Sequence, residues 1–197
     1  MATHRCRGCA QRLPGGLELC GACLREPPPL DACHAAVDYA YPWSGLIARF
    51  KFGDQPGWAT PLAQLMRRCR PLARALDDAD TVVPMPLAPR RLAGRGFNQA
   101  LELARRLAPG RVDAHLLLRV RETPAQAVLE LAERQDNVAG AFAVDPLALD
   151  RASGRHVAVV DDVMTSGATL HAAARALREA GAARVTAVVL ARTPAPG

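Results

Sequence analysis

The sequence contains few aromatic residues and almost no lysine. Phenylalanine, tryptophan and tyrosine together make up 4% of the 197 residues, and Lys51 is the only lysine. A low aromatic content disfavours an extended stacking platform for single-stranded nucleic acid. Because arginine supplies almost all of the positive charge, the net charge of +6 fits an arginine-rich composition as readily as an anionic partner.

Long apolar runs are also missing. No stretch approaches the roughly 18 to 20 apolar residues of a membrane-spanning helix, and residues 1–6 lack the apolar core of a signal peptide. We therefore expect a soluble, cytoplasmic protein without membrane insertion. In a reducing compartment its six cysteines are expected to be thiols or metal ligands rather than disulfides.

Four cysteines form two Cys-x2-Cys pairs separated by ten residues: Cys6, Cys9, Cys20 and Cys23. Each pair makes a tight turn that presents two sulfur atoms, and two such turns build a tetrahedral thiolate site. We expect a structural zinc, because so short a segment cannot bury a core of its own. A disulfide or a thioredoxin-like redox pair is the alternative, disfavoured by the compartment and by the missing βαβ context.

A proline-rich stretch over residues 26–30 predicts a stiff, extended connector. We place a domain boundary here, between a zinc module with its linker (residues 1–30) and a main domain (residues 31–197). Most of the aromatic residues fall in residues 31–60, which we interpret as a hood segment. Its rings either stack on an acceptor molecule or form the core of a small subdomain.

The most informative stretch is residues 156–170. An apolar, β-branched run ends in Asp161 and Asp162, which is typical of a buried parallel strand. A loop of small and hydroxyl residues follows and leads into a helical pattern: Met164, Thr165, Ser166, Gly167, Ala168 and Thr169. Backbone N–H groups at such a helix start bind phosphate, and carboxylates at a strand end accept hydrogen bonds from sugar hydroxyls. A ribose 5-phosphate therefore fits this stretch.

A purely structural interpretation also exists, in which the two acids cap the turn and the hydroxyl groups cap the helix. Successive strand residues point to opposite faces of a sheet. Asp161 and Asp162 are therefore not expected to act as an acid–base pair on one atom.

Strands are expected at residues 37–43 and near residues 82, 116, 159 and 187, with helices between most of them. This alternation predicts an α/β fold with a mostly parallel sheet flanked by helices.

The loop over residues 87–96 carries Arg90 and Arg91 after a strand, where arginines pair with pyrophosphate; a solvated basic loop is the alternative. Arg119, Arg121, Thr123 and Gln126 fall where a mobile loop could close over a substrate.

Residues 159–169 resemble the phosphoribosyl pyrophosphate (PRPP) signature of type I phosphoribosyltransferases. The order of further motifs resembles the ComF family (competence protein F) over nearly the whole chain. These motifs are the four-cysteine knuckle, Phe-Lys-Phe-Gly at 50–53, Pro-Met-Pro-Leu at 84–87, Arg-Gly-Phe-Asn-Gln-Ala at 95–100, Arg121-x-Thr123-x-x-Gln126, and Arg134-x-x-Asn137-x-x-Gly-Ala-Phe ending at 142. The resemblance implies a type I phosphoribosyltransferase-like fold with an N-terminal zinc finger, and a role in DNA uptake or natural transformation.

Three functions follow as hypotheses. In the first, an enzyme binds PRPP with Mg²⁺ and transfers ribose 5-phosphate with loss of pyrophosphate; Asp161 and Asp162 orient the ribose, residues 164–169 hold the 5-phosphate, and Arg90, Arg91 and Arg121 stabilise pyrophosphate. In the second, the same pocket binds PRPP or a nucleotide without turnover. In the third, the protein is a non-catalytic adaptor for single-stranded DNA and the DNA-uptake machinery, with a vestigial pocket.

Overall fold

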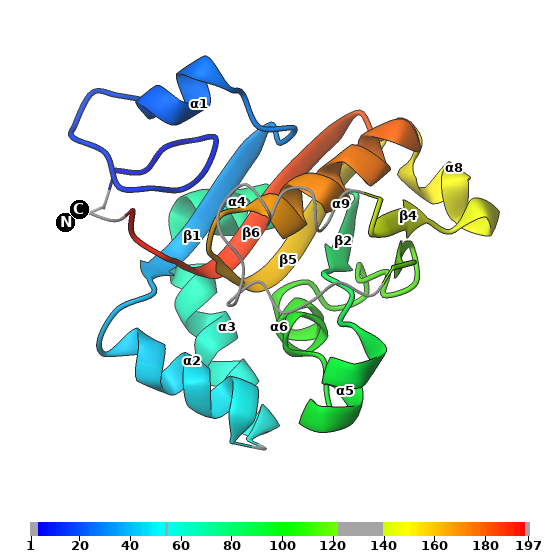
Figure 1. Cartoon of the computed structure of the whole chain (residues 1–197), viewed down its shortest axis with the longest axis horizontal. Coiled ribbons are helices and arrows are strands. Elements are labelled where there is room, and N and C mark those ends of the chain that lie inside the picture. The colour runs from blue at the N-terminus through cyan, green and yellow to red at the C-terminus, as the bar shows by residue number, and fades with distance from the viewer. Residues whose placement is uncertain (1–3, 54, 122–139, 196–197) are drawn as a thin grey trace.

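The computed structural model describes residues 4–53, 55–121 and 140–195. Its centre is a four-stranded parallel sheet in the order β1-β6-β5-β2 (Figure 1). These strands are β1 (Ala32–Asp38), β2 (Thr81–Pro84), β5 (His156–Met164) and β6 (Arg184–Arg192). Central β5 and β6 are apolar along most of their length because helices cover both faces of the sheet. The predicted α/β class is therefore confirmed.

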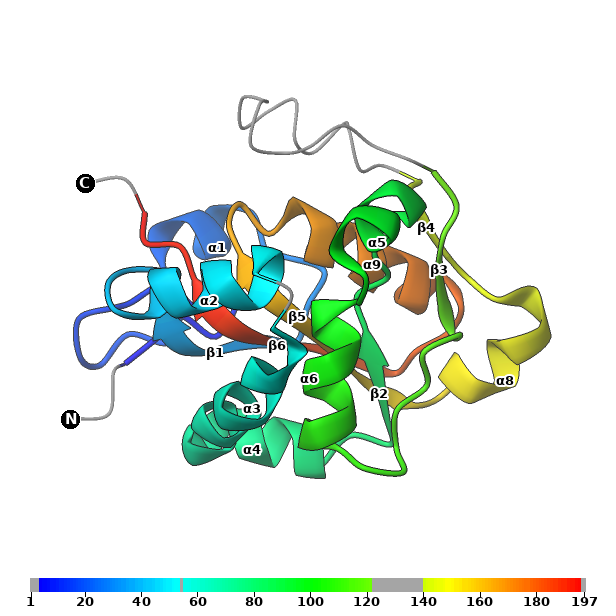
Figure 2. The same cartoon turned by 90° about the horizontal axis from the view of Figure 1, so that it is seen from below.

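The helices form two unequal layers (Figure 2). One face packs on α3 (Ala59–Arg68), α4 (Arg70–Asp77) and α6 (Gln99–Leu107), whose buried leucines meet Val160 and Val188 of the sheet. The other face packs on α9 (Ala168–Glu179), which buries mostly alanines and so lies close to the strands. The remaining helices are α1 (Gly21–Arg25), α2 (Trp43–Phe52), α5 (Pro89–Arg95), α8 (Leu149–Ala152) and the 3₁₀ turns η1 (Pro56–Trp58) and η3 (Pro146–Ala148).

Two local predictions were wrong, and one predicted strand lies outside the main sheet. The first strand spans β1 rather than residues 37–43, and residues 43–52 form α2; burial beside β6 selects the strand there over the higher β-propensity of the aromatic stretch. The expected strand near residue 116 is β3 (Leu117–Arg119), which pairs antiparallel with β4 (Phe142–Val144) outside the main sheet. The loop predicted over residues 87–96 contains α5, which begins at Pro89 and ends before Gly96 at φ 74°.

Both edges of the main sheet are covered. The predicted zinc module, described from residue 4, lies along β1, and the backbone N–H of Cys33 donates to the carbonyl of Arg7 at 2.7 Å. At the opposite edge the N–H of Val82 donates to the carbonyl of Arg111 at 2.9 Å, and Val82 accepts from Asp113 at 2.9 Å. No helix in the described part of the chain is both long enough and apolar enough to span a bilayer.

Candidate functional site

A cavity of about 720 Å³ opens at the carboxyl ends of β2 and β5. Ligands of open parallel sheets bind at this position, because the loops that leave the strands there can converge on one point. Three groups of residues line it. They are Tyr39, Lys51 and Phe52 from the hood segment; Met85, Pro86, Leu87, Arg91, Gly94, Arg95, Asn98, Gln99 and Ala100 after β2; and Arg119, Asp161, Asp162, Val163, Thr165 and Thr169.

The two predicted carboxylates both border this cavity. The backbone N–H of Asp162 donates to Asp161 Oδ1 at 2.8 Å, and Lys51 Nζ lies 2.8 Å from Asp162 Oδ1. Burial and the neighbouring charge of Asp162 raise the pKa of Asp161 to about 7, against the opposing effect of Lys51. Near neutral pH the Asp161 carboxyl can therefore both accept and donate hydrogen bonds, which suits a hydroxyl-bearing ligand.

A group of basic side chains faces the same space. Lys51, Arg91, Arg95 and Arg119 all line the cavity. The Arg95 guanidinium is 4.9 Å from the ring centroid of Phe52, and its Nη1 donates to Gln99 Oε1 at 3.0 Å. Of the predicted pyrophosphate ligands only Arg91 is among the lining residues; Arg90 and the exposed Arg121, although described, are not.

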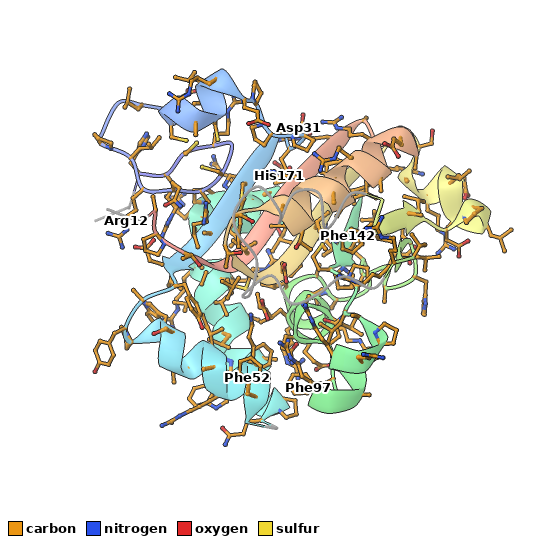
Figure 3. The ribbon with its side chains drawn as sticks, in the orientation of Figure 1. Arg12, Asp31, Phe52, Phe97, Phe142 and His171 are labelled. Carbon is orange, nitrogen blue, oxygen red and sulfur yellow. The ribbon has the colours of Figure 1, made fainter. Side chains whose placement is uncertain are left out.

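The hood segment is divided between core and cavity. Phe50 is fully buried and its ring centroid lies 5.6 Å from that of Phe97. Phe52, two residues later in α2, is 70% exposed and extends toward α5 (Figure 3). Phe50 therefore fits the core interpretation of the aromatic segment, whereas Phe52 lines the cavity and stacking of an acceptor on its ring stays a prediction.

The loop predicted to bind phosphate (residues 164–169), called the phosphate loop below, connects β5 to α9. Thr165 and Thr169 line the cavity, whereas the described Ser166, Gly167 and Ala168 are not among its lining residues. Gly167 has φ 89°, and a Cβ there would lie 2.5 Å from Met164 Cε, so only glycine fits without rearrangement. α9 then directs its first N–H groups, at the positive end of the helix dipole, toward this end of the sheet.

Met164 has a different place from the rest of the phosphate loop. Its side chain is buried, with Cys33 Sγ 3.4 Å from its sulfur atom. Its carbonyl accepts from the backbone N–H of Thr193 at 3.0 Å. Met164 therefore anchors the start of the loop in the core, and its side chain does not border the cavity.

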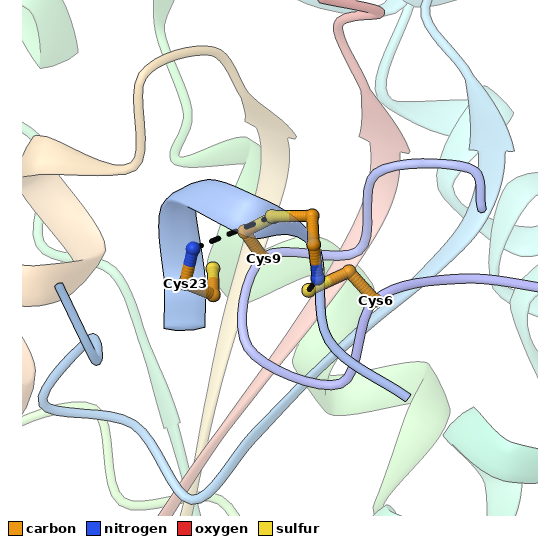
Figure 4. Close-up of side chains that lie close together, drawn as sticks. Cys6, Cys9 and Cys23 are labelled. Carbon is orange, nitrogen blue, oxygen red and sulfur yellow. Dashed lines mark hydrogen bonds between the residues drawn. The ribbon is translucent and has the colours of Figure 1, made fainter. Parts of the chain in front are cut away.

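The four predicted metal ligands lie together, and Figure 4 labels three of them, Cys6, Cys9 and Cys23. The sulfur atoms of Cys6, Cys9, Cys20 and Cys23 all lie within 4.8 Å of one another. The Cys9 and Cys20 sulfurs are 3.7 Å apart, close to the ~3.8 Å edge of a tetrahedron with Zn–S bonds of about 2.3 Å. A disulfide would need about 2.05 Å. The backbone N–H of Cys20 also donates to Cys6 Sγ at 3.2 Å, which stabilises a thiolate.

Several lining residues were not among the predicted ligand-binding residues: Tyr39, Lys51, Phe52, Arg95 and Gln99. Arg119 was predicted only as part of a closing loop, and it lines the cavity. Signals for some of them existed in the sequence. Lys51 is the only lysine and lies within Phe-Lys-Phe-Gly, and Arg95 and Gln99 belong to Arg-Gly-Phe-Asn-Gln. The predicted closing-loop residues Thr123 and Gln126, together with Arg134 and Asn137, lie outside the described residues.

Comparisons with known proteins agree with this geometry. Residues 92–197 match the phosphoribosyl transferase domain. The chain is 36% identical to the DNA utilization protein YhgH of Escherichia coli K12 over 181 residues, covering 88% of this chain and 78% of that protein. It is 32% identical to competence protein F of Haemophilus influenzae over 194 residues, covering 95% and 84% of the two chains.

Two further likenesses are partial. The chain is 37% identical to competence protein ComFC of Bacillus subtilis over 118 residues, which is 59% of this chain and 46% of that protein. Among solved structures, the glutamine PRPP amidotransferase of B. subtilis matches with a TM-score of 0.44 and 20% identity, covering 73% of this chain and 30% of that one.

Proposed function

The chain belongs to the phosphoribosyl transferase domain family, within the ComF family of competence proteins, and from this premise we propose that its cavity binds PRPP or another ribose 5-phosphate ligand. One observation carries the proposal. The cavity combines two adjacent carboxylates, two threonines of the phosphate loop and four basic side chains in about 720 Å³. A ribose ring that bears phosphates at both ends needs these three kinds of partner.

The acidic side of the cavity suits the sugar. Asp161 and Asp162 accept hydrogen bonds from the ribose hydroxyls, and the ion pair with Lys51 holds the Asp162 carboxylate in place. Thr165 and Thr169 offer hydroxyl groups to the 5-phosphate, next to the first N–H groups of α9. Met164 contributes by anchoring the loop rather than by direct contact.

The basic side of the cavity suits pyrophosphate. Arg91, Arg95 and Arg119 present guanidinium groups to it, and these pair bidentately with phosphate oxygens. Arg90 and Arg121 are neighbours of this set in sequence, and we retain them as outer members that reach pyrophosphate only if their segments move. Mg²⁺ would enter with PRPP and neutralise part of the pyrophosphate charge.

Such a site could support group transfer. The bond between ribose C1 and the pyrophosphate oxygen breaks, pyrophosphate leaves with the electron pair, and a nucleophile forms the new bond to C1. The guanidinium groups stabilise the charge that develops on the leaving group. The acidic side chains keep the ribose oriented during transfer.

We further propose that residues 1–30 form a zinc-stabilised module of the protein. Its four thiolates fill every position of a tetrahedral site, so the metal would stabilise the fold and take no part in chemistry at the cavity. Residues 31–197 would then form the phosphoribosyltransferase-like domain. Its segment 31–60 supplies the cavity wall that carries Lys51 and Phe52.

Calorimetric titration of PRPP with Mg²⁺ tests the proposal. We expect saturable binding to the wild-type protein and a loss of about 100-fold or more in affinity in Asp161→Asn/Asp162→Asn, because both ribose acceptors are weakened. Asp150→Asn, which changes an exposed carboxylate on α8, is the matched control. Equal affinity in the wild-type protein and the double variant, with the fold intact, would rule out a ribose site at Asp161 and Asp162.

A DNA-binding function is the second candidate, supported by the names of the relatives and by the net charge of +6. In this alternative the protein is an adaptor for single-stranded DNA in DNA uptake, and the pocket is vestigial. Binding would then fall steeply with salt and would survive Asp162→Asn. Fluorescence anisotropy with labelled oligonucleotides at two salt concentrations separates the alternatives.

A further inference from the structure

One buried arginine joins the zinc module to the phosphate loop. Arg192, at the end of β6, is 7% exposed. Its Nε donates to the carbonyl of Cys9 at 2.7 Å. Its Nη1 donates to the carbonyls of Met164 at 3.1 Å and Thr193 at 2.8 Å, and also to that of Thr165. A single guanidinium therefore holds one metal-binding turn and the first two residues of the phosphate loop.

Further contacts strengthen the same junction. Gln11 Nε2 donates to the carbonyl of Thr193 at 2.9 Å, and Gln11 Oε1 accepts from the N–H of Ala195 at 3.2 Å. Thr193 in turn donates its own N–H to the carbonyl of Met164. In Figure 1 the red end of β6 accordingly runs beside the blue loops of the zinc module. The start of the phosphate loop, the end of β6 and the first cysteine turn thus form one hydrogen-bonded unit.

The first cysteine turn has a conformation that needs external support. Ala10, directly after Cys9, has φ 59°, a left-handed conformation that costs a non-glycine residue energy. Ala10 is fully buried, and its carbonyl accepts from Arg5 Nη1 at 2.9 Å. Two bonds from sulfur atoms of this turn to a metal would hold it in this conformation. When the metal is lost, the turn is expected to relax and to move the Cys9 carbonyl away from Arg192.

We propose that Arg192 is a positioning residue for the phosphate loop, which makes the shape of the loop depend on metal at the four-cysteine cluster. The proposal rests on the proposed function only for the identity of the ligand. Arg192 does not line the cavity; it acts by holding the carbonyls of Met164 and Thr165, so that Thr165 faces the cavity. The zinc module then contributes to ligand binding at a distance, without touching the ligand.

Hydrogen exchange of the full-length protein tests the coupling without any ligand. We compare the backbone amides of residues 165–169 with reference amides of residues 157–160 in central β5, in zinc-loaded wild type, chelated wild type and Arg192→Lys. Lysine keeps the charge, but its single ammonium cannot span the Cys9 and Met164 carbonyls as a guanidinium does. We expect the loop amides to exchange about tenfold faster in both altered forms, with the reference amides unchanged.

Arg111→Lys is the matched control. Arg111 Nη1 also donates to several backbone carbonyls, those of Leu76 at 2.9 Å, Ala79 at 2.9 Å and Asp77 at 3.4 Å, but it lies far from the phosphate loop, beside the start of β2. We expect Arg111→Lys to leave exchange of the loop amides at the wild-type rate. Loop exchange that is unchanged in Arg192→Lys, or after chelation, overturns the proposal. Faster exchange of the β5 reference amides, or an Arg192→Lys protein that does not fold, also overturns the proposal. Either result would give the metal or Arg192 a role in the stability of the whole fold.

Titration of ribose 5-phosphate then relates the coupling to binding. We expect about tenfold weaker affinity in Arg192→Lys, zinc content equal to that of the wild type, and wild-type affinity in Arg111→Lys. If wild-type protein binds neither PRPP with Mg²⁺ nor ribose 5-phosphate, the proposed function fails while the exchange experiment still decides the coupling. If wild type binds and Arg192→Lys binds equally well, the coupling fails and the proposed function stands.

Discussion

The four-cysteine cluster and the cavity are built in opposite ways. The cluster takes its four sulfur atoms from within 18 consecutive residues, 6–23. The cavity takes its lining from residues 39–169, brought together by two parallel strands, two helix starts and the hood segment. A metal can organise the first almost alone, whereas the second exists only once the sheet is complete. Changes at the cluster should therefore act first on the local fold of the module, and changes at the cavity directly on binding.

The largest expected effect is at the cluster. Cys6→Ser or Cys20→Ser should release zinc, and we expect the free energy of local unfolding of residues 4–30 to fall by at least about 3 kcal/mol, because metal binding stabilises the folded module. Bound metal and hydrogen exchange of the amides of residues 4–30 measure the two effects. Cys69→Ser, a thiol outside the cluster, is the control and should retain full zinc. An unchanged zinc content in Cys6→Ser would contradict the four-thiolate site.

Lys51→Met should have the next largest effect. It removes the partner of Asp162, whose side chain is only 10% exposed, and leaves an unpaired carboxylate. We expect a loss of about 2–3 kcal/mol in stability together with weaker PRPP binding. Arg105→Met breaks the exposed pair with Glu102 and should cost less than about 0.5 kcal/mol. Equal losses of unfolding free energy in the two variants would show that burial of the Lys51–Asp162 pair does not increase its contribution to stability.

The raised pKa of Asp161 predicts a pH effect. Its ordinary value of 3.8 rises to about 7 in the folded protein, so the native state keeps a proton that the unfolded chain loses. The contribution of this proton to the free energy of unfolding is fully present below about pH 4 and is lost as the pH rises through 7. The advantage of Asp161→Asn over wild type should therefore grow by on the order of 2 kcal/mol between pH 5 and pH 8. Urea unfolding at both pH values checks it, and a constant difference would contradict the shift.

Gly167→Ala should have the smallest effect on stability and a specific effect on binding. Its Cβ would lie 2.5 Å from Met164 Cε, whereas at Gly154, which also has positive φ, no atom lies within 4 Å. Both alanines adopt an unfavourable backbone conformation, and Gly167→Ala should cost about 1 kcal/mol more because of the clash. Only Gly167→Ala should weaken ribose 5-phosphate binding. Calorimetry on both variants measures the difference, and equal affinities would show that the loop tolerates the shift.

The parts of this molecule that depend on residues close together in the sequence could be predicted from the sequence. The cysteine spacing and the run from β5 through the phosphate loop into α9 were recognisable, because each combines a local pattern with its own chemistry. Lys51 and Arg95 were not predicted as site residues. Their side chains reach the cavity only because α2 and α5 project over the ends of β5 and β2, and no local pattern specifies that placement.

The errors in the strands have a related cause. β1 reads Ala-Cys-His-Ala-Ala-Val-Asp, with little intrinsic preference for a strand, and forms beside β6 because burial there outweighs propensity. β3 lies outside the sheet because residues 111–113 already occupy the free edge of β2, through the bonds to Val82. α5 is different, because Pro89 and Gly96 were visible helix boundaries in the sequence.

The contact between Arg7 and Cys33 has a consequence for solubility. β1 is the last strand of the sheet, and an uncovered last strand offers its backbone groups to a strand of another molecule. The predicted zinc module lies over that strand, and its Arg7 carbonyl accepts the N–H of Cys33. Loss of metal would therefore expose the backbone groups of this edge strand as well as loosen the module. Aggregation of the chelated protein should begin by strand pairing between β1 of two molecules. With metal bound, the module would block that pairing and so prevent self-association.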